Sequence, residues 1–174
     1  MSQISDLVAA RVRDVPDFPK PGVVFKDVAP LLADGEALGA LIADIAARAS
    51  GHVDVVAGIE ARGFIFGAPV AVALGLGFVP IRKAGKLPGD TIASTYSLEY
   101  GTAEVEVQSD AFEAGARVLL VDDVLATGGT AAAACELIEQ AGATVAGLEF
   151  IIELGFLEGR DRLADRPLNS LLTV

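Results

Sequence analysis

Two adjacent acids and a glycine-rich turn stand together in the sequence VLLVDDVLATGGT, residues 118–130. Its four leading apolar residues predict a buried strand, Asp122 and Asp123 follow at the strand's end, and the turn leads into a helix. Glycines let backbone N–H groups converge, and a helix N-terminus adds positive potential, so this turn suits one phosphate group. The hydroxyls of Thr127 and Thr130 can donate further hydrogen bonds.

The acidic pair points to a sugar beside that phosphate. A carboxylate next to a phosphate is repelled, whereas a carboxylate readily accepts hydrogen bonds from sugar hydroxyls. A ribose 5-phosphate would therefore satisfy both halves of the motif. The alternative is a structural turn whose acids cap the helix. The chain contains no G-x-x-x-x-G-K-[ST] sequence and no G-x-G-x-x-G after its first predicted strand, which excludes a P-loop and a dinucleotide-binding loop.

Two further segments carry basic residues after predicted strands. GIEARGF, residues 58–64, contains Arg62, and RKAGKLPG, residues 82–89, contains Arg82, Lys83 and Lys86. The second segment holds three of the chain's 13 basic residues, although the net charge of the chain is −11. Such clustering in an acidic chain indicates an anion site. The alternative for each segment is a solvated surface loop.

Composition limits the function classes. The chain has 174 residues, of which 52% are hydrophobic, which is typical of one folded domain. No apolar stretch approaches the ~20 residues needed to span a bilayer. The single cysteine, Cys135, excludes an intrachain disulfide and a cysteine-based metal site. The acidic balance argues against nucleic-acid and membrane partners. These features predict a soluble cytoplasmic protein.

Strands and helices alternate along the chain. Hydrophobic patterns predict strands at 53–59, 78–81, 118–121 and 144–152, and helices at 5–12, 36–49, 64–74 and 131–141. The alternation predicts a single α/β domain over residues 1–174, with a parallel sheet and helices on both faces. Residues 94–108 instead predict a polar hairpin that projects from the sheet. Ligands bind at the carboxyl ends of parallel strands, so the loops after Ile59, Ile81 and Val121 are the candidate site.

The 118–130 run resembles the phosphoribosyl pyrophosphate (PRPP) signature of the type I phosphoribosyltransferases. The resemblance implies that family's fold, with an N-terminal helix and base-binding hood over residues 1–34 and a flexible loop and hairpin over residues 82–108. It also implies that Asp122 and Asp123 bind ribose hydroxyls. The residues implied to hold the 5′-phosphate are those of the turn, namely Ala126, Thr127, Gly128, Gly129 and Thr130.

Three features resemble the adenine-specific branch of that family. Members that act on 6-oxopurines usually carry an acid just before the turn, where this chain and the adenine-specific branch have alanine, here Ala126. DFPKPGVVFKD, residues 17–27, resembles the hood that covers the base. The resemblance implies that Phe25 stacks on the purine and that the Val24 backbone hydrogen-bonds it; Lys26, the next residue, stands where the branch often has arginine.

The third feature is ELGFLEG, residues 153–159, which resembles the segment that places a leucine against the purine, here Leu157. Taken without the rest of the pattern, Phe25 and Leu157 would be interpreted as core residues.

The basic segments resemble the family's pyrophosphate site. GIEARGF resembles the pyrophosphate loop, with Arg62 as a ligand and catalytic residue and with a non-proline cis peptide at Glu60–Ala61. The segment from Arg82 to Gly89, joined to YSLEYG at residues 96–101, resembles the mobile loop that closes over the substrates. The resemblance implies that Arg82, Lys83 and Lys86 bind pyrophosphate. Within YSLEYG, Glu99 is the candidate general acid near the purine N7.

The resemblance implies purine salvage: adenine and PRPP give AMP and pyrophosphate in a homodimer. Mg²⁺ would be held mainly by the substrate and waters, with no direct protein ligand. One alternative is a phosphoribosyltransferase for another purine base. A second is a regulatory module that senses PRPP, which would need a DNA-binding domain or a basic RNA-binding face. A third is an acidic receiver-type signalling domain, which would carry its acid pair early in the chain.

Overall fold

A computed structural model describes residues 3–97 and 102–174 of the chain. The chain groups into two compact units, Met1–Ile45 and Ala46–Val174. Among the described residues, no helix combines the length and the apolar character that crossing a membrane requires.

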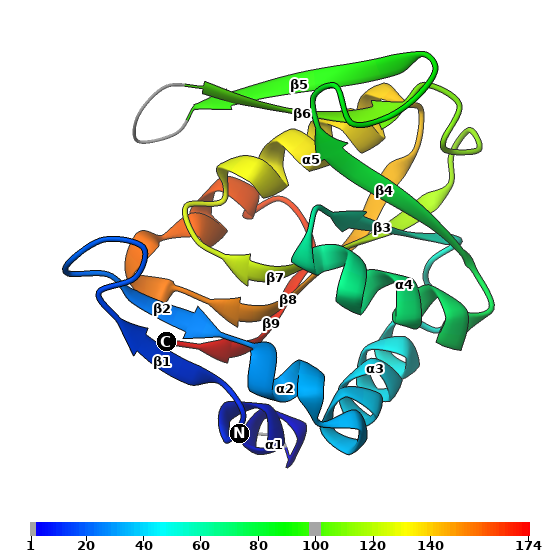
Figure 1. The fold of residues 1–174 in the computed structure, drawn as a ribbon. Coiled ribbons are helices and arrows are strands. Elements are labelled where there is room, and N and C mark those ends of the chain that lie inside the picture. The colour runs from blue at the N-terminus through cyan, green and yellow to red at the C-terminus, as the bar shows by residue number, and fades with distance from the viewer. Residues whose placement is uncertain (1–2, 98–101) are drawn as a thin grey trace. The chain divides into compact units, whose positions relative to one another are not determined.

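The first unit contains a small hairpin between helices. Helix α1 (Gln3–Ala9) precedes strands β1 (Arg13–Pro16) and β2 (Val24–Asp27), which pair antiparallel, and α2 (Ala29–Ala33) and α3 (Gly35–Ala49) follow (Figure 1). The two prolines in residues 17–27 favour an extended backbone, and the end of this segment, Val24–Asp27, is a paired strand. Asp17 and Gly22 both have positive φ, and the Asp17 carboxylate accepts a hydrogen bond of 2.8 Å from the Gly22 N–H, which closes the connection between the strands.

The second unit is built on one mixed sheet with the strand order β5-β6-β4-β3-β7-β8-β9 (Figure 1). Five neighbouring strands, from β4 to β9 in that order, are parallel, and the β5–β6 hairpin adds two antiparallel strands at one edge. The strands are β3 (Val55–Ile59), β4 (Gly77–Lys83), β5 (Thr91–Ser97), β6 (Thr102–Gln108), β7 (Arg117–Leu125), β8 (Thr144–Glu153) and β9 (Leu168–Thr173). The predicted central parallel sheet forms, and the added hairpin makes the complete sheet a mixed one.

The predicted hairpin forms, and it continues the sheet. Strand β6 pairs with the end of β4 through Arg82 opposite Glu106 and Lys83 opposite Val105. Because of this pairing, the carboxyl end of β4 lies beside β6 of the hairpin. Val105 and Val107 are buried, which explains why the hairpin lies against the rest of the unit although its sequence is polar.

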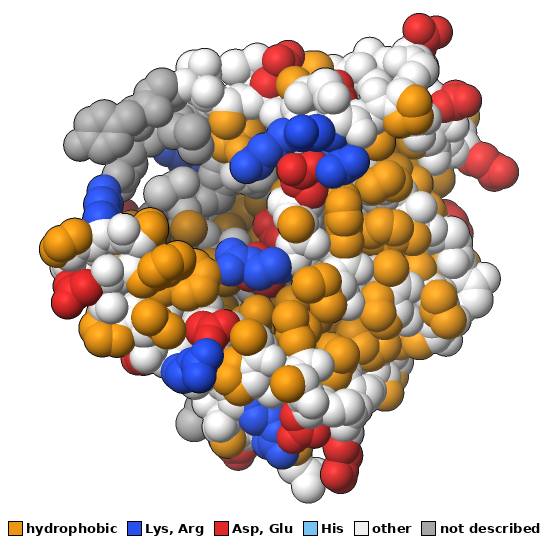
Figure 2. Space-filling view, in the orientation of Figure 1, with side chains coloured by type: hydrophobic (Ala, Val, Ile, Leu, Met, Phe, Trp, Pro, Cys, Tyr) orange, Lys and Arg blue, Asp and Glu red, His pale blue; other side chains and the backbone are white. Residues whose placement is uncertain are grey.

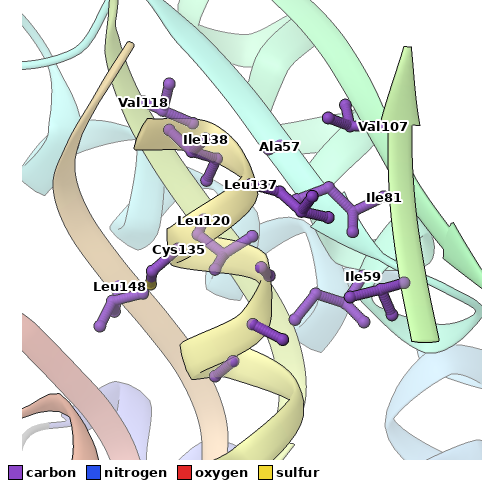
Figure 3. Close-up of a cluster of buried hydrophobic side chains, with 14 of the residues drawn as sticks. Ala57, Ile59, Ile81, Val107, Val118, Leu120, Cys135, Leu137, Ile138 and Leu148 are labelled. Carbon is purple, nitrogen blue, oxygen red and sulfur yellow. The ribbon is translucent and has the colours of Figure 1, made fainter. Parts of the chain in front are cut away.

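Helices cover both faces of this sheet, as the alternating pattern predicted. Helix α4 (Arg62–Leu74) lies against β7 and β4 at two glycines, because a Cβ added to Gly63 would lie 2.7 Å from the Val121 carbonyl oxygen and one added to Gly67 would lie 2.9 Å from the Phe78 ring. Helix α5 (Gly129–Gln140) covers the other face, where its side chains pack into a buried cluster with residues of β3, β4, β6 and β7 (Figure 3).

The sequence missed two features of this unit. Strand β7 continues to Leu125, so Asp122 and Asp123 lie within the strand and not after it. The chain also ends in a further parallel strand, β9, after two short 3₁₀ helices, η1 (Gly155–Leu157) and η2 (Gly159–Leu163). The β9 sequence LNSLLT is short and mixed in polarity, so it gave no strand pattern.

Candidate functional site

The glycine-rich turn of residues 126–130, the phosphate turn, joins β7 to α5 (Figure 1). Gly128 takes a left-handed conformation with φ of 78° at the N-cap of α5, a conformation that glycine adopts without strain. Gly128 and Gly129 are buried, whereas Thr127 is exposed. The turn lines a pocket, to which Asp122 and Phe150 also contribute.

Gly159 holds the phosphate turn from the other side. A Cβ added to Gly159 would lie 2.0 Å from the Ala126 carbonyl oxygen, and one added to Gly128 would lie 2.4 Å from the Gly159 carbonyl oxygen. Two backbones therefore touch where no side chain fits. The sequence did not assign Gly159 to the site, because a glycine at the end of ELGFLEG has the same pattern as any turn glycine.

An ion pair between the exposed Arg160 and the buried Glu153 anchors the segment that carries Gly159. Arg160 donates from Nε to Glu153 Oε1 at 3.0 Å and from Nη2 to Glu153 Oε2 at 2.5 Å, and the Ser170 hydroxyl donates to the same carboxylate. Glu153 is buried at the end of β8, and these partners hold its pKa below the ordinary value, chiefly through Arg160. The anchor fixes where the chain turns back toward Ala126.

Asp122 and Asp123 lie beside each other at the carboxyl end of β7. Asp123 is buried and Asp122 is half-buried, and Asp122 Oδ1 accepts a hydrogen bond of 2.9 Å from the Asp123 N–H. Arg62, the first residue of α4, brings its Nε to 2.6 Å from Asp123 Oδ2. That oxygen nevertheless has no aligned hydrogen-bond donor among the described residues. Asp123 is therefore a buried acceptor whose charge is balanced mainly by Arg62.

The environment of the acidic pair changes both acidities. Burial raises the pKa of Asp122 well above the ordinary value, and the neighbouring Asp123 charge raises it further. Burial also raises the pKa of Asp123, but the Arg62 guanidinium opposes that rise. Asp122 is thus the member of the pair that keeps its proton to the higher pH, and the pair titrates as a unit.

The segment with Arg62 follows β3 and contains the non-proline cis peptide that the resemblance implied, at Glu60–Ala61. The Glu60 carboxylate accepts a hydrogen bond of 2.9 Å from Arg82 Nε at the end of β4. The loops after β3 and β4 therefore meet, as expected for parallel neighbours. Arg82 is already engaged by one carboxylate, so an anionic ligand would have to compete with Glu60 for it.

The basic loop, residues 82–87, leaves the end of β4, where Figure 2 shows basic side chains around an acidic group. Lys83 and Lys86 are exposed. Arg82 Nη1 donates to the Lys86 carbonyl at 3.1 Å, and the buried Glu106 accepts from the Lys86 and Leu87 N–H groups at 2.9 Å each. The sequence did not assign Glu106, because the alternation in TAEVEVQ places it with exposed polar residues.

The residues expected to hold a base lie in both units. Phe25 on β2 meets Phe18 edge-on, with ring centroids 5.2 Å apart, and the adjacent Val24 is exposed. Lys26 Nζ pairs at 2.7 Å with Asp14, its cross-strand neighbour. Leu157, in η1 of the second unit, is half-buried.

Glu99, the candidate acid, lies outside the described residues.

Comparisons with known proteins place this chain in a family. The phosphoribosyl transferase domain family matches residues 31–163. The adenine phosphoribosyltransferase of Thermobifida fusca is 59% identical over 174 residues, which cover 99% of each chain. The crystal structure of adenine phosphoribosyltransferase from Thermoanaerobacter pseudethanolicus superposes with a TM-score of 0.94 at 46% identity, covering 98% of this chain and 99% of that one.

The Saccharomyces cerevisiae adenine phosphoribosyltransferase, solved with an imino-altritol bisphosphate and adenine, gives a TM-score of 0.94 at 40% identity, covering 98% of this chain and 99% of that one. The chain belongs to the phosphoribosyltransferase family, within its adenine phosphoribosyltransferase group.

Proposed function

We propose that this chain is a purine-salvage enzyme that converts adenine and PRPP to AMP and pyrophosphate. The observation that carries the proposal is the junction of β7 and α5, where the buried Asp123, the half-buried Asp122 and a backbone turn fit a ribose and its 5′-phosphate. The likeness to relatives named adenine phosphoribosyltransferase supports adenine as the base, as does the yeast structure with adenine.

The ribose 5-phosphate is proposed to bind across β7 and the phosphate turn. Asp123 presents a buried carboxylate oxygen that lacks an aligned donor within the described ranges, and a ribose hydroxyl can supply one. Asp122 would accept or donate at the second hydroxyl, depending on its proton. The backbone N–H groups of the phosphate turn and the hydroxyls of Thr127 and Thr130 would bind the phosphate at the N-terminus of α5.

Pyrophosphate is proposed to leave toward Arg62 and the basic loop. Arg82 and Lys83 end β4, Lys86 follows that strand, and Arg62 follows the adjacent parallel strand β3. Their charges therefore lie at the carboxyl ends of neighbouring strands. Glu60 and Ala61 would contribute backbone groups, because a carboxylate repels pyrophosphate. Local cations are needed here because the chain as a whole carries a net charge of −11.

The adenine is proposed to meet the hood through Phe25, Val24 and Lys26, and Leu157 from η1. An aromatic ring on a short, hydrogen-bonded hairpin loses little entropy when it stacks on a flat heterocycle. Ala126 supplies no carboxylate near the base, which disfavours a 6-oxopurine and leaves room for the adenine ring. These contacts are proposed to determine which base the protein accepts.

The reaction would proceed by attack of adenine N9 on C1 of the ribose while the bond from C1 to pyrophosphate breaks. Positive charge develops on the sugar, so the enzyme's work is to position the reactants, stabilise the leaving group and exclude water. Arg62 is suited to two tasks, because it already balances Asp123 and can also face the leaving oxygens. Glu99 is proposed to manage the proton at N7.

Mg²⁺ is proposed to enter with PRPP, coordinated mainly by substrate oxygens and waters. Asp122 and Asp123 fit such an ion, because carboxylates on the sugar side can accept hydrogen bonds from its waters. When bound, the ion would neutralise part of the pyrophosphate charge. The chain's own contribution remains the acid pair and the cations.

We further propose a cytoplasmic homodimer. Figure 2 shows hydrophobic side chains gathered over α4 and β4, and Ile65 and Val72 of α4 are exposed with 41% and 80% of their surface accessible. A second copy of the chain is the occupant that suits an apolar face at the helix that carries Arg62. Sedimentation of the purified protein would give the oligomeric state, and an Ile65→Lys, Val72→Lys variant should shift it toward the monomer.

The decisive experiment is to incubate the protein with PRPP, Mg²⁺ and each free base, and to measure the nucleotide formed. We expect AMP from adenine, with kcat/KM well above the values for hypoxanthine and guanine. Preference for a 6-oxopurine would support the alternative of another purine base. Binding of PRPP with no nucleotide from any base would support a sensing module.

A further inference from the structure

Glu106 is a buried carboxylate beneath the exposed basic loop. It lies on β6 opposite Arg82, and only 6% of its surface is accessible. One oxygen accepts from the Lys86 and Leu87 N–H groups at 2.9 Å each, and the other accepts from the Thr91 hydroxyl at 3.3 Å. A single side chain thus gathers donors from the basic loop and from the start of β5.

The Glu106 carboxylate is charged despite its burial. Burial by itself raises its pKa, but N–H groups of Leu87, Gly85 and Lys86 and the Thr91 hydroxyl outweigh that effect and hold the pKa below the ordinary value. A buried charge persists only where hydrogen bonds replace its water. The carboxylate and the shape of the loop therefore depend on each other.

Successive N–H groups that converge on one point form an anion-binding concavity. In this loop Glu106 occupies that concavity from the sheet side. The backbone of residues 85–87 is consequently turned inward, while the side chains of Lys83 and Lys86 remain exposed. Arg82 braces the same turn through its hydrogen bond to the Lys86 carbonyl.

We infer that Glu106 is a positioning residue for the pyrophosphate subsite, holding the basic loop in the shape that presents Lys83 and Lys86 beside Arg82. The inference rests on the proposed function of these three cations. It adds a residue that would contact no substrate and would act through the loop.

Simple electrostatics predicts the opposite effect. A negative charge among three cations lowers their attraction for an anion, so removing it should strengthen PRPP binding if the loop kept its shape. A purely structural role would lower thermal stability and leave the affinity for PRPP unchanged. The sign of the change in KM therefore distinguishes the three roles.

The first test compares Glu106→Gln with Glu104→Gln. Both substitutions remove one negative charge from β6, but Glu104 is exposed and two residues away. We expect Glu106→Gln to raise KM for PRPP about tenfold, the loss that corresponds to one charge-assisted hydrogen bond, with KM for adenine changed by less than about twofold. Glu104→Gln should leave both constants near wild type, and Glu106→Asp, which keeps the charge, should recover part of the loss. An unchanged or lower KM for PRPP in Glu106→Gln overturns the inference.

A second pair of variants tests the inference even if the Glu106→Gln protein does not fold. Gly85 and Gly89 are exposed glycines with φ of 78° and 77°, and a Cβ on either would meet nothing within 4 Å. Replacing either by alanine carries a similar conformational cost. The Gly85 N–H helps to lower the pKa of Glu106, and Gly85 directly precedes the N–H groups that donate to this carboxylate. Gly85→Ala should therefore raise KM for PRPP several-fold more than Gly89→Ala. Equal values in the two variants contradict the inference.

Failure of the inference can be told apart from failure of the proposed function. A wild-type protein that forms no AMP contradicts the function. A Lys83→Ala, Lys86→Ala variant with wild-type KM for PRPP contradicts the pyrophosphate assignment. If both of those experiments succeed and the Glu106 and Gly85 variants still bind PRPP as the wild type does, the positioning role alone is wrong.

Discussion

The phosphate turn and the basic loop are both candidate anion sites at strand ends, yet they are built in opposite ways. The phosphate turn is buried at Gly128 and Gly129, carries no charged side chain, and is fixed where the Gly128 and Gly159 backbones touch. The basic loop is exposed, carries three cations, and is held by hydrogen bonds to Glu106 and the Glu60–Arg82 pair. One site offers fixed geometry, and the other offers charge.

The difference fits the two anions that the proposed reaction handles. A 5′-phosphate stays attached to the sugar throughout, so a rigid backbone cradle can locate C1 of the ribose accurately. Pyrophosphate gains charge as its bond breaks and must then depart, which suits flexible cations on a loop. The rigid site for the retained phosphate thus follows β7, and the charged site for the leaving pyrophosphate lies at the end of β4, in the same sheet.

The largest expected effect is that of Glu99, the candidate acid. Glu99→Gln should lower kcat by about 10²–10⁴-fold, the usual contribution of a positioned acid, while adenine and PRPP still bind. Single-turnover kinetics would measure the chemical step and a melting curve would measure stability. Wild-type chemistry in this variant, at any stability, would exclude Glu99 as the acid.

One methyl group added at Gly159, against the phosphate turn, should reduce activity nearly as much. A Cβ at Gly159 would overlap the Ala126 carbonyl, so Gly159→Ala must displace the turn, and we expect kcat/KM for PRPP to fall roughly 100-fold, as misplacement of about 1 Å can cause. Gly155→Ala is the matched control, because its Cβ would lie 3.1 Å from the Thr173 methyl group and an ordinary 3.7 Å from the Val174 carbonyl oxygen. Similar losses in the two variants would show that the contact between Gly159 and the turn has no special role.

The acid pair beside the turn should give the next effect. Asp122→Asn and Asp123→Asn each remove a charged acceptor, and at least one of them should weaken PRPP binding about tenfold or more, since such bonds contribute ~1.5–3 kcal/mol. Calorimetric titration with PRPP measures the affinity directly. Wild-type affinity in both variants would mean that the ribose does not bind at Asp122 and Asp123.

Much of this architecture could be predicted from the sequence because it depends on local patterns. Apolar runs located β3, β7 and β8, and helix periodicity located most of α3 and α4. The mixed sheet could not be predicted, because the pairing of β6 with β4 depends on contacts between distant segments. Strand β9, with its mixed polarity, gave no signal either.

The candidate site divides in the same way. Motif spacing identified the phosphate turn, the acid pair and the basic loop, which are contiguous in sequence. Gly159 and Glu106 could not be identified, because each acts on a segment more than 15 residues away along the chain, Gly159 on Ala126 and Glu106 on Lys86. A glycine in a turn and a glutamate in a strand are also common, so neither residue stands out in the sequence.

Asp122 should show a conflict between binding and stability. Its pKa in the folded protein is raised, so the stability gained from its protonated form is full below the ordinary value of 3.8 and is lost as pH rises through the raised value. Asparagine mimics the protonated form at every pH. Asp122→Asn should therefore raise the melting temperature at neutral pH by roughly 2–4 °C, about 1 kcal/mol for a chain of this length, and this gain should shrink as pH falls. Melting curves across pH test it, and a variant less stable than wild type at neutral pH would contradict it.

The smallest expected effect is that of salt, and it addresses the comparison between the two sites most directly. Salt screens exposed charges strongly and buried dipoles weakly, with a Debye length of about 10 Å at 0.1 M. Lys83 and Lys86 are exposed, whereas Gly128 and Gly129 are buried. Raising the ionic strength should thus weaken PRPP binding by about threefold more than AMP binding, because AMP carries the 5′-phosphate without the pyrophosphate.

A Lys83→Ala, Lys86→Ala variant separates the two contributions to that salt effect. It removes both exposed cations from the basic loop and leaves the phosphate turn intact, so its PRPP affinity should start lower and then respond to salt about as AMP affinity does. Calorimetric titrations of both proteins with both ligands, at low and at high ionic strength, provide the comparison. If AMP and PRPP show the same salt dependence in the wild type, the 5′-phosphate is also held mainly by exposed charge, and the contrast between a rigid turn and a charged loop is wrong.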